Sequence, residues 1–365
     1  MPAPLDRDTI LKALRSVTDP DLRKDIVTLG FVKDLAVGEG KVSFTIELTT
    51  PACPVKDQMR EQAAAAVRAL GVNDVDVLMT AKVRSVSAPE KGHPPHPGVK
   101  NVIAVGAGKG GVGKTTVAVN LALALAKCGS KVGILDADVY GPNVPMMLGL
   151  HATQLITDGK SIVPAEKYGA QVVSMAFLTQ DDQAIVWRGP MLHAAIRQFF
   201  QDVAWKDLDY LIVDMPPGTG DIQLTLSQKV PLTGAVIVTT PQDIALLDAR
   251  KGLKMFEKVG VPILGVVENM AVHVCSNCGH TEHIFGAEGG KRMSAEYGVD
   301  YLGGLPLALS IREQADAGQP TVVSDPDGEI AAIYRTVARK IAVKIAEKAK
   351  DYSAKFPNIT ISKTT

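Results

Sequence analysis

The sequence of 365 residues predicts an α/β fold, in which a mostly parallel sheet flanked by helices follows a small α+β domain. Three observations predict this fold. From residue 100 onward, strand-like apolar runs alternate with helical stretches, which is typical of parallel strands joined by right-handed crossovers. A glycine-rich loop stands between the first of these runs and the helical stretch after it. A proline-rich segment separates this region from the first 88 residues.

The larger region, residues 100–350, supplies the strands and helices of the main domain. Its predicted strands are Val102–Val105, Val132–Leu135, Val172–Ala176, Leu211–Val213, Ala235–Val238 and Ile263–Val267. Its predicted helices cover about residues 115–128, 190–202, 220–229, 244–258 and 330–350. The last helix has one apolar stripe, which favours packing on the domain over lying on a membrane. Residues 351–365 are predicted to form a flexible tail.

Residues 1–88 are predicted to form the separate α+β domain. Helical spacing covers Asp8–Val17 and 57–70, and strand patterns cover Val42–Leu48 and 75–83. Residues 89–99 form a linker whose prolines and glycines favour an extended chain. This segment contains His93 and His96, and two histidines in a proline-rich tether more often bind nothing.

Composition excludes several classes of function. The formal net charge is zero, which argues against a broad nucleic-acid surface. The first eight residues lack the apolar core of a signal peptide, and no apolar run reaches the length of a transmembrane helix. Four cysteines are too few for a disulfide framework in a chain of this length. A reducing, cytoplasmic location is therefore expected, with no nucleic-acid partner and no stable membrane association.

The glycine-rich loop carries the strongest chemical signal. Residues 108–115 match the phosphate-loop pattern G-x-x-x-x-G-K-T at every position. Glycines let backbone amides approach phosphate oxygens at the start of a helix, where the helix dipole favours negative charge. Lys114 would add a fixed cation, and the Thr115 hydroxyl would hold Mg²⁺. The predicted nucleotide-binding residues are Gly108, Lys109, Gly110, Gly111, Val112, Gly113, Lys114, Thr115 and Thr116.

Aspartates follow two of the predicted strands. Asp136 and Asp138 come after Leu135, and Asp214 comes after Val213. Taken alone, each aspartate is better explained as the cap of a helix. Because ligands of parallel sheets bind at the carboxyl ends of the strands, two such segments beside a phosphate loop favour a role at Mg²⁺.

Cys275-Ser-Asn-Cys278 is the second chemical feature. This spacing suits a metal, an iron–sulfur cluster or a redox pair, but it supplies only two of the four ligands that such sites usually need. His280 and His283 could complete a zinc site within one chain. Alternatively, a two-fold dimer would bring two cysteine pairs together at its axis. An unliganded pair is the third reading.

Cys53 lies just before a predicted helix, between Pro51-Ala and Pro54. The helix dipole there can lower the pKa of a thiol and make it reactive. A small buried residue in a turn explains the same position equally well.

Several motifs together resemble one known family. The second lysine of the loop, Lys109, resembles the deviant Walker A class that includes MinD, ParA and the nitrogenase iron protein. Within that class the chain resembles the Mrp (ApbC/Nbp) branch of ATP-hydrolysing carriers and scaffolds for iron–sulfur clusters. The motifs are Asp138-Val-Tyr-Gly-Pro-Asn, Trp187-Arg-Gly-Pro-Met191, Asp214-Met-Pro-Pro-Gly-Thr-Gly-Asp, Thr240-Pro-Gln-Asp, Val267-Glu-Asn-Met270 and Cys275-x-x-Cys278. Asp19-Pro-Asp-Leu and Thr50-Pro-Ala-Cys53-Pro resemble the small domain of iron–sulfur assembly proteins and phenylacetate-oxygenase maturation proteins.

The resemblance implies a slow, Mg²⁺-dependent ATPase that is a homodimer. Lys109 would reach the partner chain's nucleotide, Asp138 would orient the attacking water, and Asp136 and Asp214 would support Mg²⁺ through water. Asn269 would contact adenine, in a pocket closed by the backbone near Pro306.

The resemblance also implies the cargo and partners. Cys275 and Cys278 of two chains would bridge one [4Fe–4S] cluster, which is delivered to apo-proteins and received from assembly scaffolds. Cys53 matches a reactive cysteine of the small-domain family. Asn143 stands where a serine is common, a change expected to be harmless, and no role is assigned to Arg188 or Asp243.

Two other functions remain as alternatives. A positioning ATPase of the MinD/ParA kind would dimerise on membrane or DNA, but the cysteine pair has no purpose in that reading. A nucleotide-gated electron-transfer protein would share the bridging cluster, but no motif for a reductase partner is present in the sequence.

Overall fold

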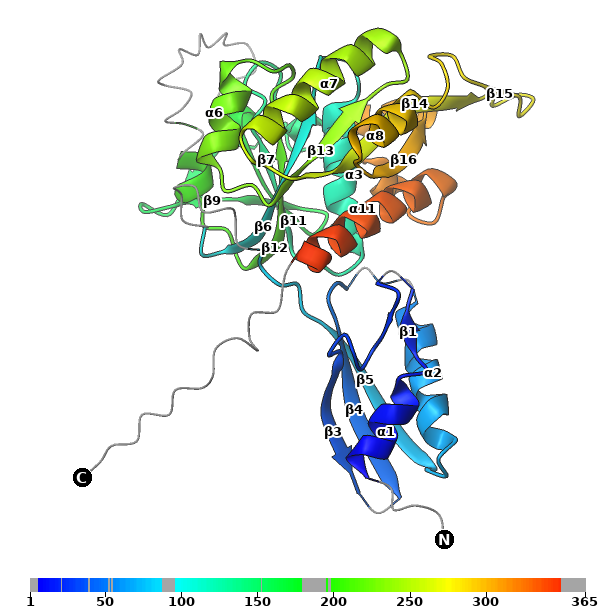
Figure 1. The fold of residues 1–365 in the computed structure, drawn as a ribbon. Coiled ribbons are helices and arrows are strands. Elements are labelled where there is room, and N and C mark those ends of the chain that lie inside the picture. Colours follow the sequence, from blue (N-terminus) through cyan, green and yellow to red (C-terminus); the bar gives the residue numbers. More distant parts are fainter. Residues whose placement is uncertain are drawn as a thin grey trace.

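The computed structural model describes residues 6–20, 22–38, 40–51, 53, 55–86, 96–151, 153–178, 195 and 198–348. Its elements form two units, a smaller N-terminal one and a larger one built on a broad sheet (Figure 1). The predicted α/β class with a mostly parallel sheet and a preceding α+β part is confirmed. None of the described helices combines the length and apolar character needed to cross a membrane.

The N-terminal unit packs two helices on a three-stranded sheet. Its elements are α1 (Arg7–Leu14), β1 (Thr18–Asp19), β2 (Lys24–Asp25), β3 (Val32–Val37), β4 (Lys41–Leu48), α2 (Lys56–Arg68) and β5 (Asp74–Ala81). The central strand β4 pairs antiparallel with β3 and parallel with β5. Every second residue of β4 from Val42 to Leu48 is buried, as the alternating pattern predicts. Helix α1 ends at Leu14, three residues before the predicted end, and the chain then turns into the short β1–β2 pair.

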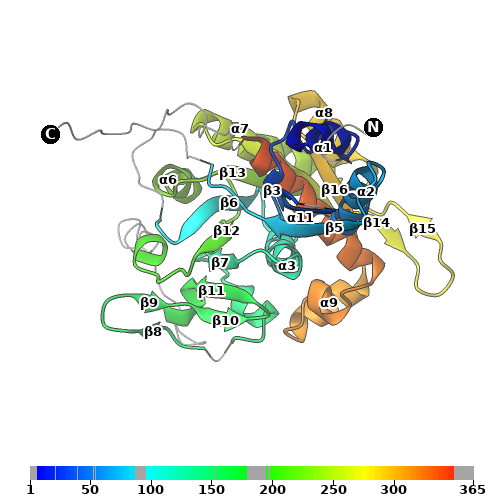
Figure 2. The ribbon, with the colours of Figure 1, turned by 90° about the horizontal axis from the view of Figure 1, so that it is seen from below.

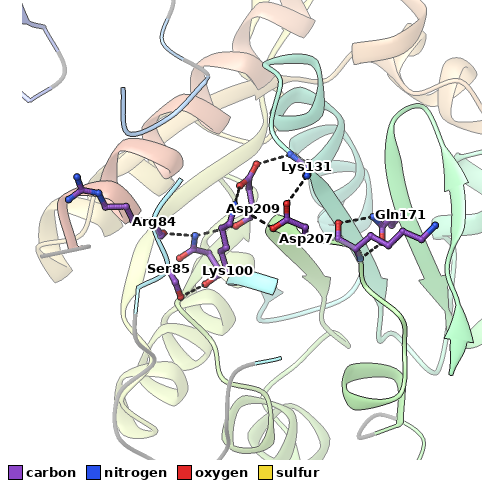
Figure 3. A network of polar contacts seen from close by, with 9 residues as sticks. Arg84, Ser85, Lys100, Lys131, Gln171, Asp207 and Asp209 are labelled. Atoms are coloured by element: carbon purple, nitrogen blue, oxygen red, sulfur yellow. Dashed lines mark hydrogen bonds and ion pairs between the residues drawn. The ribbon is translucent and has the colours of Figure 1, made fainter. Parts of the chain in front are cut away.

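The segment that leaves β5 is bonded to the start of the main sheet. Asn101 donates to the Arg84 carbonyl (3.0 Å) and accepts from the Val86 amide (3.1 Å). Ser85 donates to the Lys100 carbonyl (2.9 Å), and Lys100 pairs with Asp209 at 2.8 Å (Figure 3). These bonds fix residues 84–86 at the amino ends of the strands. Residues 89–95 of the predicted linker lie outside the described residues.

The larger unit contains a nine-stranded sheet. Its strands are β6 (Val99–Ala107), β7 (Val132–Asp136), β10 (Ala165–Lys167), β11 (Ala170–Ser174), β12 (Leu208–Asp214), β13 (Gly234–Thr239), β14 (Ile263–Val274), β15 (Thr281–Glu282) and β16 (Tyr301–Pro306). Their order is β10-β11-β7-β12-β6-β13-β14-β15, with β16 also paired to β14. Only β10–β11 and β14–β15 pair antiparallel among these strands. A short pair, β8 (Ile156–Thr157) and β9 (Ile162–Val163), lies apart from this sheet.

Helices cover both faces of this sheet (Figures 1 and 2). They are α3 (Lys114–Lys127), α4 (Val144–Met147), the short 3₁₀ turn η1 (Met175–Leu178), α6 (Asp221–Lys229), α7 (Asp243–Lys258), α8 (Gly289–Tyr297), α9 (Leu309–Asp316), α10 (Thr321–Ser324) and α11 (Glu329–Lys348). Ile103 and Val105 of β6 pack with α3 and α11, whereas Val102 and Ala104 face the layer that contains α7. Burial on both faces explains why the strands read as continuous apolar runs.

Helix α3 is the central helix of one layer. Residues 117–125 of α3 are all buried, because the helix lies between the sheet and α11. The apolar stripe of α11 is buried at Val337, Ile341 and Ile345, which confirms that this helix packs on the domain.

Several predicted boundaries needed correction. The strand predicted at 172–176 ends at Ser174, because residues 175–178 turn into η1. The strand predicted at 263–267 continues to Val274, where its last residues pair with β15 and β16. Residues 190–194, 196–197 and 349–350 of the predicted helices lie outside the described residues, whereas 198–201 are helical. Within β14, Met270 has φ +55° and the pairing with β16 shifts between Glu268 and Val272.

Candidate functional site

Polar side chains from three adjacent strands meet at the carboxyl edge of the main sheet. Asp136 ends β7 and is the register partner of both Asp214, which ends β12, and Ser174, which ends β11. All three side chains are completely buried. The sheet therefore places two carboxylates side by side, as the rule for parallel sheets predicts.

The phosphate loop follows β6, the next strand, and leads into α3. Gly111 and Gly113 adopt left-handed backbone conformations, with φ of +82° and +80°. Gly108 is required for a different reason, since a Cβ there would lie 2.1 Å from the carbonyl of Asp248 in α7. The first glycine of the motif thus lets α7 pack directly on the loop.

Lys114 connects the loop to the carboxylates. Its ammonium lies 2.6 Å from Asp214 Oδ1 and 3.4 Å from Asp138 Oδ2, and the lysine is only 6 % exposed. The Thr115 hydroxyl donates to Asp214 Oδ2 at 2.7 Å. The predicted lysine, threonine and aspartates therefore form one buried cluster.

Asp136 is the second fully buried carboxylate of this cluster. Ser174 donates to Asp136 Oδ2 at 2.8 Å, and the amides of Val144 and Asp138 donate at 3.2 and 3.3 Å. Burial, with a further contribution from the charge of Asp214, raises the pKa of Asp136 to about 8. Burial likewise raises the pKa of Asp214, although Lys114 opposes the effect. Two neighbouring carboxylates are buried here, and the Lys114 ammonium pairs directly with Asp214. The site therefore favours added positive charge.

Asp138 begins the loop after β7. It is 7 % exposed, and its Oδ1 accepts from the Tyr140 amide at 3.3 Å. Asn143 is exposed and precedes α4 without capping it through its side chain. The loop thus holds Asp138 toward Lys114 and leaves Asn143 at the surface.

Asn269 also reaches the phosphate loop. Its side-chain amide donates to the Val112 carbonyl at 2.9 Å, and a Cβ at Gly113 would lie 2.1 Å from its Nδ2. Pro306, at the end of β16, is the register partner of Val272 rather than of Asn269. In this structure Asn269 supports the loop, and its contact with adenine stays a prediction.

The remaining loop residues lie nearer the surface. Lys109 and Thr116 are half-buried, and Gly110 is exposed. Lys109 is not part of the Lys114–Asp214 cluster, since the ion pairs described there are made by Lys114.

Two residues that hold the site in place, Ser174 and Glu268, were not predicted from the sequence as site residues. Ser174 positions Asp136, and its place at the end of a strand beside Leu135-Asp136 was the available signal. Glu268 is buried and accepts from the Gly290 amide (3.0 Å) and the Tyr301 hydroxyl (3.1 Å), which ties β14 to α8 and β16. The tyrosine is far along the chain, so no local pattern indicated this bond.

Cys275 and Cys278 lie at the tip of the β14–β15 hairpin, which projects from the body of the larger unit (Figure 1). The Cys275 amide donates to the His280 carbonyl (2.9 Å), and the Gly279 amide donates to the Cys275 carbonyl (2.9 Å). Hydrogen bonds from the backbone of Cys278 and Asn277 lower the pKa of the Cys275 thiol. The turn thus favours the thiolate, the form that binds metals.

Within the described residues, no three His, Cys, Asp or Glu side chains gather to hold a metal ion. His283 hydrogen-bonds the Ala271 carbonyl at 2.9 Å, and His280 is 3.7 Å from Glu282. The two histidines are thus not arranged with the cysteines as a four-ligand set in one chain.

Other predicted residues lie elsewhere. Cys53 is buried in the core of the N-terminal unit, and Asp243 is exposed as the first residue of α7. His96 accepts from the Gly98 amide at 3.0 Å and packs edge-on against Phe200. Arg188, the Trp187–Met191 motif and His93 lie outside the described residues.

The sheet, the phosphate loop and the carboxylates at its edge define a P-loop NTPase. A family model for the NUBPL iron-transfer P-loop NTPase, of the ParA class, matches residues 98–342, and one for iron-sulfur cluster assembly proteins matches residues 7–79. An iron-sulfur cluster carrier protein from Synechocystis is 49% identical over 352 residues, which cover 94% of this chain and 99% of the relative. The chain therefore belongs to the iron-sulfur cluster carrier family of P-loop NTPases.

Two solved structures share the fold of the larger unit. A nucleotide-binding protein from Archaeoglobus fulgidus, in complex with ADP, is 36% identical with a TM-score of 0.57, covering 64% of this chain and 91% of that chain. The cell division ATPase MinD of Pyrococcus furiosus is 24% identical with a TM-score of 0.51, covering 66% of this chain and 98% of that chain.

The contact between Gly108 and α7 generates a stability prediction. Gly108→Ala places a methyl group against the backbone of Asp248, so we expect the free energy of unfolding to fall by about 1–3 kcal/mol. Gly110→Ala is the matched control, because nothing lies within 4 Å of an added Cβ there. Urea denaturation of the nucleotide-free protein measures both, and equal stability of the two variants contradicts the packing role of Gly108.

The raised pKa of Asp136 predicts how stability depends on pH. Between an ordinary value of about 4 and the folded value of about 8, the folded protein holds a proton that the unfolded chain has lost. The free energy of unfolding must therefore fall as pH rises through this window, by at most about 1.4 kcal/mol per pH unit for this one group. Asp136→Asn should flatten this slope in urea denaturation with EDTA present.

Asp158→Asn serves as the control for this slope. Hydrogen bonds from the amides of Ser161 and Lys160 lower the pKa of the exposed Asp158, so its titration lies below the window. Identical slopes for wild type and Asp136→Asn would contradict the assignment.

Proposed function

We propose that this protein binds and slowly hydrolyses ATP, and that as a homodimer it carries a [4Fe–4S] cluster to apo-proteins. The observation that carries the proposal is the combination, in one chain, of the Lys114–Asp214–Asp136 cluster and the exposed cysteine hairpin. The family of the chain supports the cargo, and the ADP held by the Archaeoglobus protein supports the nucleotide.

When the phosphate loop binds a nucleotide, the phosphates would replace carboxylates as the anions that pair with Lys114. In the structure Lys114 is paired with the carboxylates of Asp214 and Asp138. Phosphate oxygens at the start of α3 would take these carboxylates' place on the ammonium, while the loop amides donate to the same oxygens. The loop residues from Gly108 to Thr116 are the proposed contacts of the phosphates. Asn269 and the backbone near Pro306 are the proposed contacts of the adenine ring.

Mg²⁺ fits this donor set. Asp136, Asp214 and Thr115 present carboxylate and hydroxyl oxygens, the ligands that Mg²⁺ prefers. When bound, the ion would neutralise charge on the phosphates. Thr115 would hold it directly, and Asp136 and Asp214 would hold its water.

Asp138 is proposed to orient the attacking water. Its carboxylate accepts from the Tyr140 amide and lies 3.4 Å from the Lys114 ammonium. Lys109 is proposed to act across the dimer, because it stands on the loop outside the buried cluster. A cation placed there would stabilise charge that develops on the partner's phosphates.

The hairpin is proposed to supply half of the cluster ligands. Cys275 and Cys278 give two thiolates, and a second chain would give the other two. Val274 and Ile284, which flank the cysteines, are each 52% exposed, so the hairpin also presents apolar surface that a second copy would cover. The N-terminal unit, which includes Cys53, would then contact assembly scaffolds or clients.

The two lysines should have separable effects. We expect Lys114→Ala to abolish tight nucleotide binding, because the loop loses the cation within its own site. Lys109→Ala should largely keep binding but lower the hydrolysis rate by about 10²–10³-fold, the usual effect of removing one group that stabilises the transition state. A binding titration with fluorescent ADP and a phosphate-release assay measure the two effects.

Lys254→Ala is the control, since this exposed lysine of α7 pairs with Glu257 at 3.0 Å. Unchanged hydrolysis in Lys109→Ala would remove the cross-dimer role.

The cluster proposal predicts a loaded dimer. After anaerobic reconstitution with iron and sulfide, native mass measurement should find two chains with about four irons, and thiolate-to-iron charge transfer should give broad absorption. Cys275→Ser and Cys278→Ser should each abolish this absorption. His280→Ala, His283→Ala and the control Cys128→Ser should retain it. Recovery of activity by an apo-enzyme that needs a [4Fe–4S] cluster measures transfer.

The zinc alternative gives the opposite pattern. A monomer that holds one colourless ion, released by His280→Ala, would overturn the carrier proposal.

A further inference from the structure

A pocket lies between the two units, at the opposite end of α3 from the phosphate loop. It has a volume of about 390 Å³, within the usual range for small-molecule sites. The N-terminal unit lines it with Cys53 and Lys56, and the larger unit with Lys127, Cys128, Arg335 and Arg339. Lys127 and Cys128 stand at the carboxyl end of α3, whose amino end carries Lys114.

The contacts around this pocket connect the same two units. The Tyr210 hydroxyl, fully buried in the larger unit, hydrogen-bonds Thr50. A Cβ at Gly129, next to Cys128, would lie 3.6 Å from Pro51. The bonds of residues 84–86 to β6 lie at the same edge of the sheet (Figure 3). Both walls of the pocket are therefore set by specific contacts.

The lining is strongly positive. Two lysines and two arginines line the pocket, and its described lining contains no carboxylate. Arg335 and Arg339 are half-buried on α11, while Lys56 and Lys127 are exposed. Asp57, next to Lys56, pairs with Arg60 at 3.5 Å rather than lining the pocket.

The positive charges converge on one point. Burial raises the pKa of the Cys128 thiol, but the charges of Arg335, Arg339 and Lys56 each act to lower it. Lys56 belongs to the N-terminal unit and the two arginines to the larger unit, and all three line the same pocket as Cys128.

The helix ends do not cancel this charge. The carboxyl end of α3 faces the pocket and contributes about half of one negative charge, while the amino end of α2 at Lys56 contributes a similar positive one. The two helix ends therefore contribute opposite charges of similar size, and the side chains set the net charge of the pocket. A bound anion would lower the repulsion among these neighbouring cations.

We infer that this pocket binds a small oxyanion, a phosphate-bearing or carboxylate-bearing ligand, which bridges the N-terminal unit to α3 and α11. Arg335 and Arg339 supply planar guanidinium groups suited to either kind of oxygen pair. Lys56 contributes the cation from the N-terminal unit. The ligand would bind at the opposite end of α3 from the phosphate loop.

The test uses Cys128 as a local reporter in the full chain. The rate at which iodoacetamide alkylates Cys128 is followed by peptide mass spectrometry while inorganic phosphate or citrate is titrated, with EDTA present. We expect one of these anions, at millimolar concentration, to slow the reaction about tenfold. Cys275 in the same sample should keep its rate, because it lies at the distant hairpin.

Two variants assign the effect to the pocket. Arg335→Ala and Lys56→Ala should each raise the anion concentration needed for protection about tenfold, the effect of losing a charge-assisted hydrogen bond. Arg335 also donates to the Pro326 carbonyl, so Lys56→Ala, at the exposed start of α2, provides the variant that is least able to disturb folding. Arg312→Ala, an exposed arginine paired with Asp316 on α9, should change nothing.

The outcomes separate the sources of the anion. Stronger protection by phosphate assigns a phosphate-bearing ligand, and stronger protection by citrate a carboxylate-bearing one. The inference is overturned if neither anion at tens of millimolar slows Cys128, if Cys275 slows equally, or if both pocket variants keep wild-type protection. None of these readouts depends on ATP hydrolysis or on cluster binding.

Discussion

The arrangement at the carboxyl edge of the main sheet depends on one interaction, the buried ion pair between Lys114 and Asp214. Parallel register forces Asp136 and Asp214 to end neighbouring strands, and both carboxylates are fully buried. Burying charge in this way costs several kcal/mol per ion unless partners offset it. One ammonium and a few donors offset it only in part, as the raised pKa of Asp136 shows. The site is therefore built to receive more positive charge than the chain itself supplies.

The other contacts at this edge serve that arrangement. Gly108 lets α7 press on the loop, Asn269 holds the Val112 carbonyl, and Ser174 holds Asp136. Farther along, Asn120 of α3 accepts from the Val322 amide at 3.1 Å, which fixes the helix against α10. Helix α3 is about 21 Å long, at 1.5 Å for each of its 14 residues. It forms a rigid connection between the phosphate loop and the contacts with the N-terminal unit.

Much of this could be predicted from local patterns. The phosphate loop, the aspartates after Leu135 and Val213 and the cysteine pair are short motifs, and the rule for parallel sheets brings the first two together. Contacts between distant segments could not be predicted in this way. Gly108 against Asp248, Glu268 with Tyr301, and Lys56 beside Arg335 depend on how whole elements pack. The end of β11 at Ser174 was also missed, because Met175 and Ala176 are apolar enough to continue a strand although they form a 3₁₀ turn.

Strand β14 connects the phosphate loop to the cysteine hairpin. It contains Asn269, which touches the phosphate loop, and it ends one residue before Cys275. Between them Met270 adopts a left-handed backbone and the pairing with β16 slips. The arm from Met270 to Cys275 is about 17 Å long at the rise of an extended strand, so a rotation of about 10° at its base sweeps the thiols through about 3 Å. The backbone at Met270 therefore sets where the two cysteine side chains lie relative to the phosphate loop.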